Sequence, residues 1–311
     1  MERIPKNPIL QFHPDTMECV RKLCNFNTQL EVKEAVDLLD EWVKKQSHYR
    51  KRNFTRSYLE KTIIINKGSV ERAKTQIDQL CALKTIMPTF FEKCHARDEL
   101  GHLKSYCIQG LLPKLTPEHY RVYIGKFRKD GLTSYTDIFR FGVLINEYLK
   151  EYDYCNGLVL IADIRDINVL RLSYSLSLTE LRNILTIATE GYDMRIKGIH
   201  YVTSSRAVEV LLRLMRSVLS AKLSERMRVH KTVESLYEVV SKEILPAEYG
   251  GDEESLLTLY DKWVEELSEK KNVDYFKEMR EIRAKEGVRQ TEVYRSQYCG
   301  LAGTFRKLNI D

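Results

Sequence analysis

The sequence of 311 residues is poor in the features that mark non-globular chains. It has only 14 glycines and 7 prolines, which excludes collagen-like, linker-dominated and low-complexity proteins. Its longest apolar run, residues 157–164, is far shorter than the roughly 18–20 residues of a membrane span. The first fifteen residues, MERIPKNPILQFHPD, lack the apolar stretch of a secretory signal. Because hydrophobic residues make up 43%, we expect a folded protein, and because signal and membrane-span patterns are missing we expect it in the cytoplasm.

The sequence also lacks the common motifs of catalysis. It has no CxxC pair among its 7 cysteines, which fits a reducing compartment, and no HxxxH or HExxH pair of metal ligands. It has no GxGxxG or GxxxxGK[ST] phosphate loop and no GxSxG nucleophile motif. Asp163 and Asp166 follow a predicted strand, where we expect them to cap or form ion pairs. We therefore predict no cofactor, no metal and no enzymatic activity.

The pattern of apolar residues predicts two kinds of structure. Residues 1–95 are helical, with helix-spaced apolar positions at 32–45 and 69–84. After residue 113, predicted strands alternate with predicted helices, which indicates a mostly parallel sheet with crossover helices. The strands are expected at 121–127, 157–164, 195–202 and 226–230, and the helices at 136–148, 177–189, 206–219 and 252–270. The fold class is thus α/β behind an all-α region, with domains at 1–95, 96–258 and 259–311.

Positive charge is concentrated in one window. Residues 195–231 hold nine basic and two acidic side chains, a net +7, whereas the whole chain carries +6. Arg195 and Lys197 are two apart on a predicted strand, and Lys222 and Arg226 are four apart, so each pair projects to one side. A four-cation cluster of this kind binds phosphate groups well. Spacing alone leaves a solvated surface patch as the alternative.

The helix expected at 206–219 separates these two pairs. Its apolar stripe lies opposite Arg206, Arg213 and Arg216, so it fits either packing on the sheet or lying in a membrane interface. Nucleic acid is a weaker partner for the window, because Tyr201 is its only aromatic residue apart from two histidines. We therefore expect no nucleic-acid binding.

Several segments in order resemble the CRAL-TRIO (Sec14-like) lipid-binding family. These segments are NGLVLIADIRD (156–166), RIKGIHYVTSS (195–205), LSERMRVH (223–230) and ILPAEYGG (244–251). The tail CGLAGTFRKLNID (299–311) is similar to that of arthropod members related to α-tocopherol transfer protein and cellular retinaldehyde-binding protein. The resemblance implies an α/β/α domain with a hydrophobic cavity, preceded by a helical bundle.

The resemblance also implies residues for each role. Arg195, Lys197, Lys222 and Arg226 match the cations that bind phosphoinositide phosphates. The matching pocket positions are Phe139, Asn146, Leu158, Leu160, Ala162, Ile184, Ile187, Ala188, Met194, Ile196 and Ile199. A mobile gate helix, from about residue 204 to 219, would present Val208, Leu211, Leu212 and Met215. Ala162 stands where a Phe is common, which would enlarge the cavity.

The implied function is that of an intracellular carrier for one small hydrophobic ligand, such as a tocopherol, a retinoid or another terpenoid. The carrier would be a monomer that associates peripherally with phosphoinositide-containing membranes, where the gate opens and the ligand is released. An alternative remains a phosphoinositide-binding adaptor or scaffold that carries no cargo.

Overall fold

The computed structural model describes residues 4–131 and 135–285, so the tail motif at 299–311 lies outside the described residues. The N-terminal part is helical, as the sequence predicts. Its helices are α1 (Thr16–Lys22), α2 (Gln29–Lys45), α3 (Arg56–Ile65), α4 (Val70–Ile86) and α5 (Ala96–Leu100), with 3₁₀ turns η1 (Pro88–Phe90) and η2 (Gly101–Ser105). Thr28 and Glu31 form a capping box at the start of α2, which satisfies backbone N–H groups that the helix leaves free. Local sequence therefore fixes where this helix begins.

A five-stranded sheet follows, with the strands side by side in sequence order. They are β1 (Cys107–Leu115), β2 (Tyr120–Phe127), β3 (Gly157–Asp163), β4 (Ile196–Val202) and β5 (Met227–His230). β2 to β5 are parallel, and β1 pairs antiparallel with β2. The sequence analysis missed β1, because Gly110 and Pro113 interrupt its strand pattern. Gly110 is required there, since a Cβ would lie 2.6 Å from the ring of Trp263.

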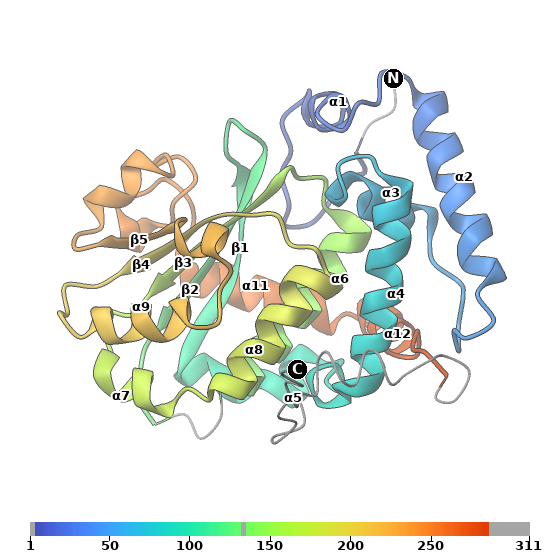
Figure 1. Cartoon of the computed structure of the whole chain (residues 1–311). Helices are drawn as coiled ribbons and strands as arrows, with labels where there is room; N and C mark the ends of the chain where they lie inside the picture. The colour runs from blue at the N-terminus through green and yellow to red at the C-terminus, as the bar shows by residue number, and fades with distance from the viewer. Residues whose placement is uncertain (1–3, 132–134, 286–311) are drawn as a thin grey trace, which may run out of the picture.

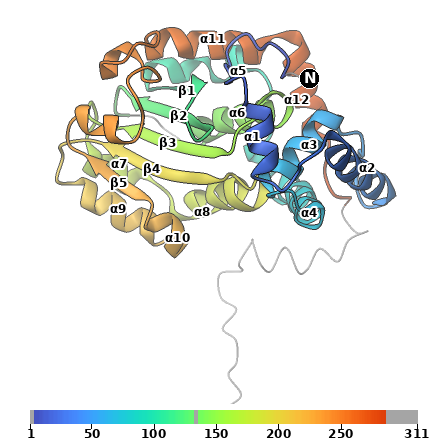
Figure 2. The same cartoon turned by 90° about the horizontal axis from the view of Figure 1, so that it is seen from above.

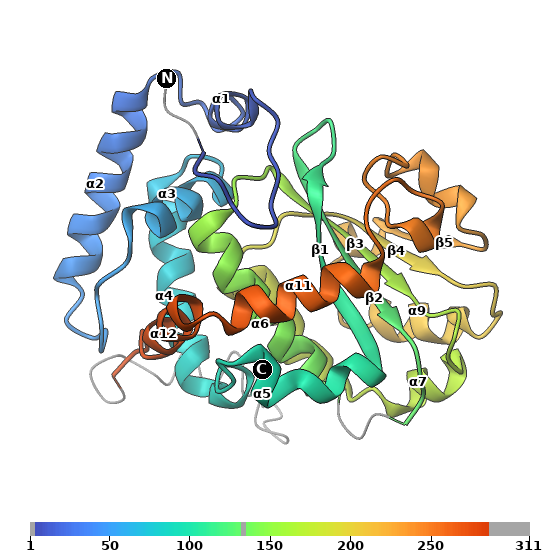
Figure 3. The same ribbon diagram turned by 180° about the vertical axis from the view of Figure 1, so that it is seen from behind.

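Helices cover both faces of this sheet. They are α6 (Thr136–Tyr152), α7 (Val169–Ser175), α8 (Leu178–Thr186), α9 (Val208–Arg216), α10 (Ala221–Ser224), α11 (Leu256–Ser268) and α12 (Lys270–Arg280). The short turns are the π-helical η3 (Ile187–Gly191) and the 3₁₀ turns η4 (Glu234–Glu238) and η5 (Ala247–Tyr249). The opposite views of Figures 1 and 3 show α8 and α9 on one face and α11 on the other. Figure 2 shows α2, α3 and α4 grouped beside the sheet.

The predicted elements after residue 113 are confirmed, although their ends shift: α6 extends beyond the predicted helix at 136–148, and α11 is shorter than the one predicted at 252–270. α9 covers only part of the predicted helix at 206–219, and the helix predicted at 177–189 divides into α8 and the π-helical turn η3. The predicted domain boundary at residue 258 falls inside α11. The division of the chain into domains stays a prediction.

A buried polar network joins the N-terminal helices to the α/β part. Lys84 of α4 donates to Glu147 Oε1 of α6 at 2.6 Å and to the carbonyl of Met279 at 2.8 Å. Tyr192 donates to the same Glu147 oxygen at 2.8 Å. Lys84 and Glu147 are 1% and 4% exposed, so their charges lie out of water and depend on each other. This network fixes α6, and α6 carries one wall of the site described below.

The end of β3 is held by a second network. Asp163 accepts hydrogen bonds from Arg165 Nη2 and from the hydroxyl of Tyr249, both at 2.8 Å. Burial disfavours the charge of Asp163, but the bonds from Arg165 and Tyr249 outweigh burial and hold its pKa below the usual value. Asp166 pairs with Lys126 at 3.2 Å. Both aspartates thus lie in ion pairs, as the sequence predicts. Among the described residues, no helix has the length and apolar character that crossing a bilayer requires.

Candidate ligand cavity and cation cluster

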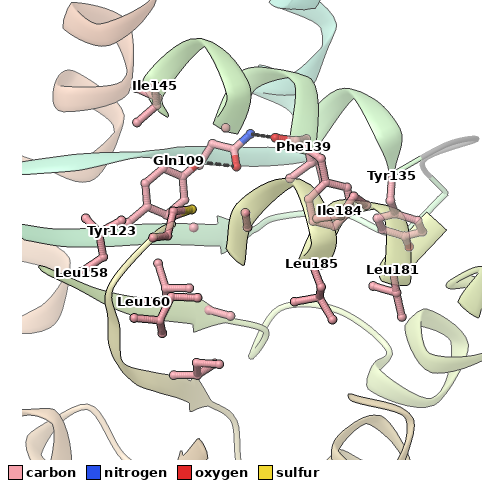
Figure 4. A pocket seen from close by; sticks show the side chains of 18 of the residues that line it. Gln109, Tyr123, Tyr135, Phe139, Ile145, Leu158, Leu160, Leu181, Ile184 and Leu185 are labelled. Carbon is pink, nitrogen blue, oxygen red and sulfur yellow. Dashed lines mark hydrogen bonds between the residues drawn. The ribbon is translucent and has the colours of Figure 1, made fainter. Parts of the chain in front are cut away.

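A cavity of about 310 Å³ lies between the sheet and helices α6, α8 and α9. Its wall is almost entirely apolar, with side chains from β2, β3 and β4 on one side and from the helices on the other (Figure 4). Small-molecule sites have volumes of this order or larger and are lined mainly by hydrophobic residues with a few polar groups. The cavity therefore suits one small apolar ligand.

Small residues at positions facing the interior explain why the fold leaves a cavity here. Ala162 of β3 pairs with Gly125 of β2 and with Tyr201 of β4, and all three line the cavity. A Cβ built on Gly125 would meet no atom closer than 3.7 Å, so the floor there has unused room. Gly142 of α6 and Ala188 of η3 are the small residues that line the opposite wall. The cavity thus results from glycine and alanine at positions where larger side chains would fill it.

All eleven predicted pocket residues line this one cavity. They are Phe139, Asn146, Leu158, Leu160, Ala162, Ile184, Ile187, Ala188, Met194, Ile196 and Ile199. Of the predicted gate residues, Leu211 and Met215 line it too, whereas Val208 and Leu212 are buried in the apolar cluster around α9. Whether these side chains contact a ligand stays a prediction.

The cavity also has a polar pair that the sequence analysis missed. Tyr123 donates from its hydroxyl to Gln109 Oε1 at 2.8 Å, and Gln109 Nε2 donates to the carbonyl of Ile138 at 3.2 Å (Figure 4). Burial raises the pKa of Tyr123 well above its usual value, so the phenol is neutral. Gln109 lies on β1, the strand that the sequence pattern does not reveal. The predicted polar residue, Asn146, uses its Nδ2 to donate to the carbonyl of Gly142 at 2.7 Å.

Helix α9 lines the cavity with one face and is exposed to solvent on the opposite face. Val208, Leu211 and Leu212 are buried, while Arg213 and Arg216 on the opposite face are exposed. α9 packs on α7, and short non-helical segments connect it to β4 and α10. An amphipathic helix with arginines on its outer face has the composition of helices that lie in membrane interfaces.

The four predicted cations converge near the start of β4, and a fifth joins them. Burial is the main cause that lowers the pKa of Lys197, and repulsion by neighbouring cations adds to it. Those cations are Arg195, Arg226, Lys67 and Lys222. Lys67 follows α3 with a φ of 56° and belongs to the N-terminal region, so it lies outside the basic window of the sequence. Cations that repel one another in this way attract a multivalent anion.

The geometry of the cluster differs in detail from the spacing argument. α10 ends at Ser224, so Lys222 and Arg226 do not share one helix. Lys222 is exposed, whereas Arg226 donates from Nη1 to the carbonyl of Ile196. The Lys197 ammonium lies 4.7 Å from the ring centroid of Tyr120. Lys222 is thus the cation whose charge is changed with the least structural cost.

One group of possible metal ligands lies apart from the cavity. Asp15, Cys19 and His119 place ligand atoms within 4.8 Å of one another. The Cys19 thiol donates to Asp15 at 3.2 Å, and His119 Nδ1 lies 3.3 Å from Thr16 Oγ1. All three side chains thus already have protein partners, and among the described residues nothing else at this group points to an ion.

The fold and the cavity together define a class: an α/β domain that encloses an apolar cavity for a small hydrophobic molecule. Residues 107–251 match the family model described as the CRAL/TRIO domain. The chain therefore contains a CRAL/TRIO domain. The predicted resemblance is confirmed.

Similar proteins share only part of the chain. Over 97 residues it is 28% identical to the protein of Homo sapiens named "Alpha-tocopherol transfer protein-like", covering 31% of this chain and 28% of that protein. Over 101 residues it is 34% identical to "Clavesin-2" of Mus musculus, covering 31% of this chain and 29% of that protein. The alignments thus span less than a third of either relative. The solved structure titled "Crystal structure of Sfh5" aligns with a TM-score of 0.36 and 12% identity, covering 94% of this chain and 100% of that chain.

Proposed function

We propose that this protein carries one small hydrophobic ligand in the cavity and releases it at phosphoinositide-containing membranes when α9 moves outward. The observation that supports the first half most strongly is the apolar cavity of about 310 Å³ inside the CRAL/TRIO domain. Each 200 Å² of apolar ligand surface removed from water contributes about 5 kcal/mol to binding. The cavity wall is thus sufficient to hold an apolar molecule that water would not dissolve.

Release requires a partner that favours the open form. Arg213 and Arg216 on the outer face of α9 are exposed, as is Arg206 just before that helix begins. Lys222 of the cation cluster lies on α10, which packs against α9. An anionic membrane attracts each basic residue near its surface by about 1 kcal/mol. Four or five cations therefore shift the equilibrium of a gate helix by several kcal/mol, which is enough to change the dominant state.

A transfer assay tests this function. The protein is loaded with a fluorescent tocopherol analogue, chosen because one relative's name refers to tocopherol, and mixed with acceptor vesicles. We expect vesicles that contain a phosphoinositide to receive the ligand faster than vesicles of neutral phospholipid. The variant Lys222→Glu changes the charge by two units at an exposed cation, and we expect its vesicle affinity to fall about 30-fold.

The matched control is Lys33→Glu, the same charge change at an exposed position of α2, one of the N-terminal helices (Figure 1). Equal losses in both variants would refute a specific phosphate site. A protein that binds phosphoinositide vesicles but transfers no ligand would be an adaptor, the alternative function.

A further inference from the structure

A second, smaller cavity adjoins the main one at the amino end of β3 and β4. Its volume is about 30 Å³. It shares five lining residues with the main cavity, so the two spaces are adjacent. The shared residues are Asn146, Leu149, Leu158, Tyr192 and Met194. We call the smaller space the side cavity.

Two cations that line the side cavity have buried donor atoms that make no hydrogen bond. Lys150 is 2% exposed, and its Nζ makes no hydrogen bond. Arg195 also lines the side cavity, and its Nη1 is buried and unbonded. A buried charged donor without a partner is costly, so each such group in a native protein requires an explanation. Asp193 attracts both cations but bonds to neither donor atom, and an anion in the side cavity would give both donors a partner.

Lys150 lies where a ligand in the main cavity would reach it. Asn146 and Lys150 are four residues apart on α6 and so lie on one face of the helix. Asn146 lines both cavities, whereas Lys150 lines only the side cavity. A ligand whose apolar part fills the main cavity could therefore extend past Asn146 and place its terminal group next to the Lys150 ammonium.

The other ionisable side chains that line the side cavity are hydrogen-bonded or neutral. Asp153 accepts from Arg121 at 2.7 Å in a buried ion pair. Lys61 donates a hydrogen bond from its ammonium to Ser57 Oγ. Burial raises the pKa of the Cys155 thiol, so it carries no charge. Lys150 and Arg195 are thus the lining cations with unbonded donors among the described residues.

We infer that the ligand is an apolar molecule with a terminal carboxylate, whose head group occupies the side cavity between Lys150 and Arg195. This inference rests on the proposed carrier function and narrows its ligand class. A space of about 30 Å³ holds two or so water-sized groups, which matches the two oxygens of a carboxylate. A sugar phosphate head group is much larger.

Matched ligands test this inference on the full chain. We would measure the fluorescence of cis-parinaric acid and of the corresponding alcohol and methyl ester as each is titrated into the protein. We expect the acid to bind about 10- to 100-fold more tightly than the alcohol or ester, the factor that hydrogen bonds to charged groups contribute. In Lys150→Met, which keeps the apolar stem, we expect the affinity for the acid to fall by that factor and the affinity for the alcohol to stay.

The control is Lys33→Met, the same substitution at an exposed lysine of α2 that lines neither cavity. We expect it to leave the preference for the acid unchanged. Equal affinities of wild-type protein for acid and alcohol, or an equal loss of both in Lys150→Met, would overturn the inference while leaving the carrier function intact. Failure of the acid, alcohol and ester alike to bind the wild-type protein would overturn the carrier function and the inference with it.

Discussion

Filling the cavity at Ala162 is the most informative perturbation of the site. Ala162 lies in the floor of the cavity beside Gly125, where there is room for a larger side chain. The substitution Ala162→Phe places a ring in this space and removes about 100 Å² of the apolar surface that a ligand would otherwise cover. At about 25 cal/mol per Å², the loss is about 2.5 kcal/mol, or roughly 60-fold in Kd.

The assay compares ligand affinity with stability. Fluorescence titration with an apolar probe gives Kd, and thermal unfolding gives Tm for the same preparations. Because the ring fills an empty space, we expect Tm to stay or rise while the affinity falls. The control is Ala221→Phe, the same substitution at an exposed position of α10. Unchanged affinity in Ala162→Phe, with Tm preserved, would show that ligands bind elsewhere and would refute the cavity as the site.

Two further predictions concern buried charges. Burial lowers the pKa of Lys150 to about 7, although Asp193, Glu147 and Cys155 act to raise it. The unfolded chain therefore binds more protons than the folded one between pH 7 and about 10.5, so stability rises over that range. We expect ligand-free Lys150→Met to be more stable than wild type by several kcal/mol at pH 7 and by little near pH 10. Urea unfolding of both proteins at the two pH values measures this difference in stability, and a difference that stays the same at both would contradict the prediction. Glu147→Leu leaves Lys84 buried without its carboxylate, and we expect a loss of about 3–5 kcal/mol in unfolding free energy, which the double variant with Lys84→Met recovers in part. An additive loss in the double variant would show that the two charges do not depend on each other.

The fold and the main cavity follow largely from the sequence, because they depend on periodic patterns and on motifs that keep their order. The apolar run of β3 and the stripe of α9 identify these elements without tertiary information. β1 was not predicted, since Gly110 and Pro113 are unfavourable in a strand. Gly110 is required by the close approach of the Trp263 ring, and Pro113 is tolerated because β1 is an edge strand. Gln109 was missed with that strand.

The cation cluster and the side cavity show a different limit. Lys67 lies far from the basic window in sequence, and only the fold brings it next to Lys197. From the sequence alone, Lys150 is indistinguishable from an ordinary exposed lysine near the end of a helix. Its burial depends on the packing of α6 against α3 and on the start of β3 and β4. Neither arrangement has a local signal, because each is assembled from elements that are distant along the chain.

The central claim is that the cavity holds one hydrophobic ligand. Native mass spectrometry of the purified protein, incubated with an equimolar mixture of apolar alcohols, acids and esters, tests it directly, and an organic extract of the same sample identifies what is bound. The account predicts one ligand per chain in wild-type protein and little or none in Ala162→Phe. No bound species in the wild type, or the same occupancy in both proteins, would contradict it.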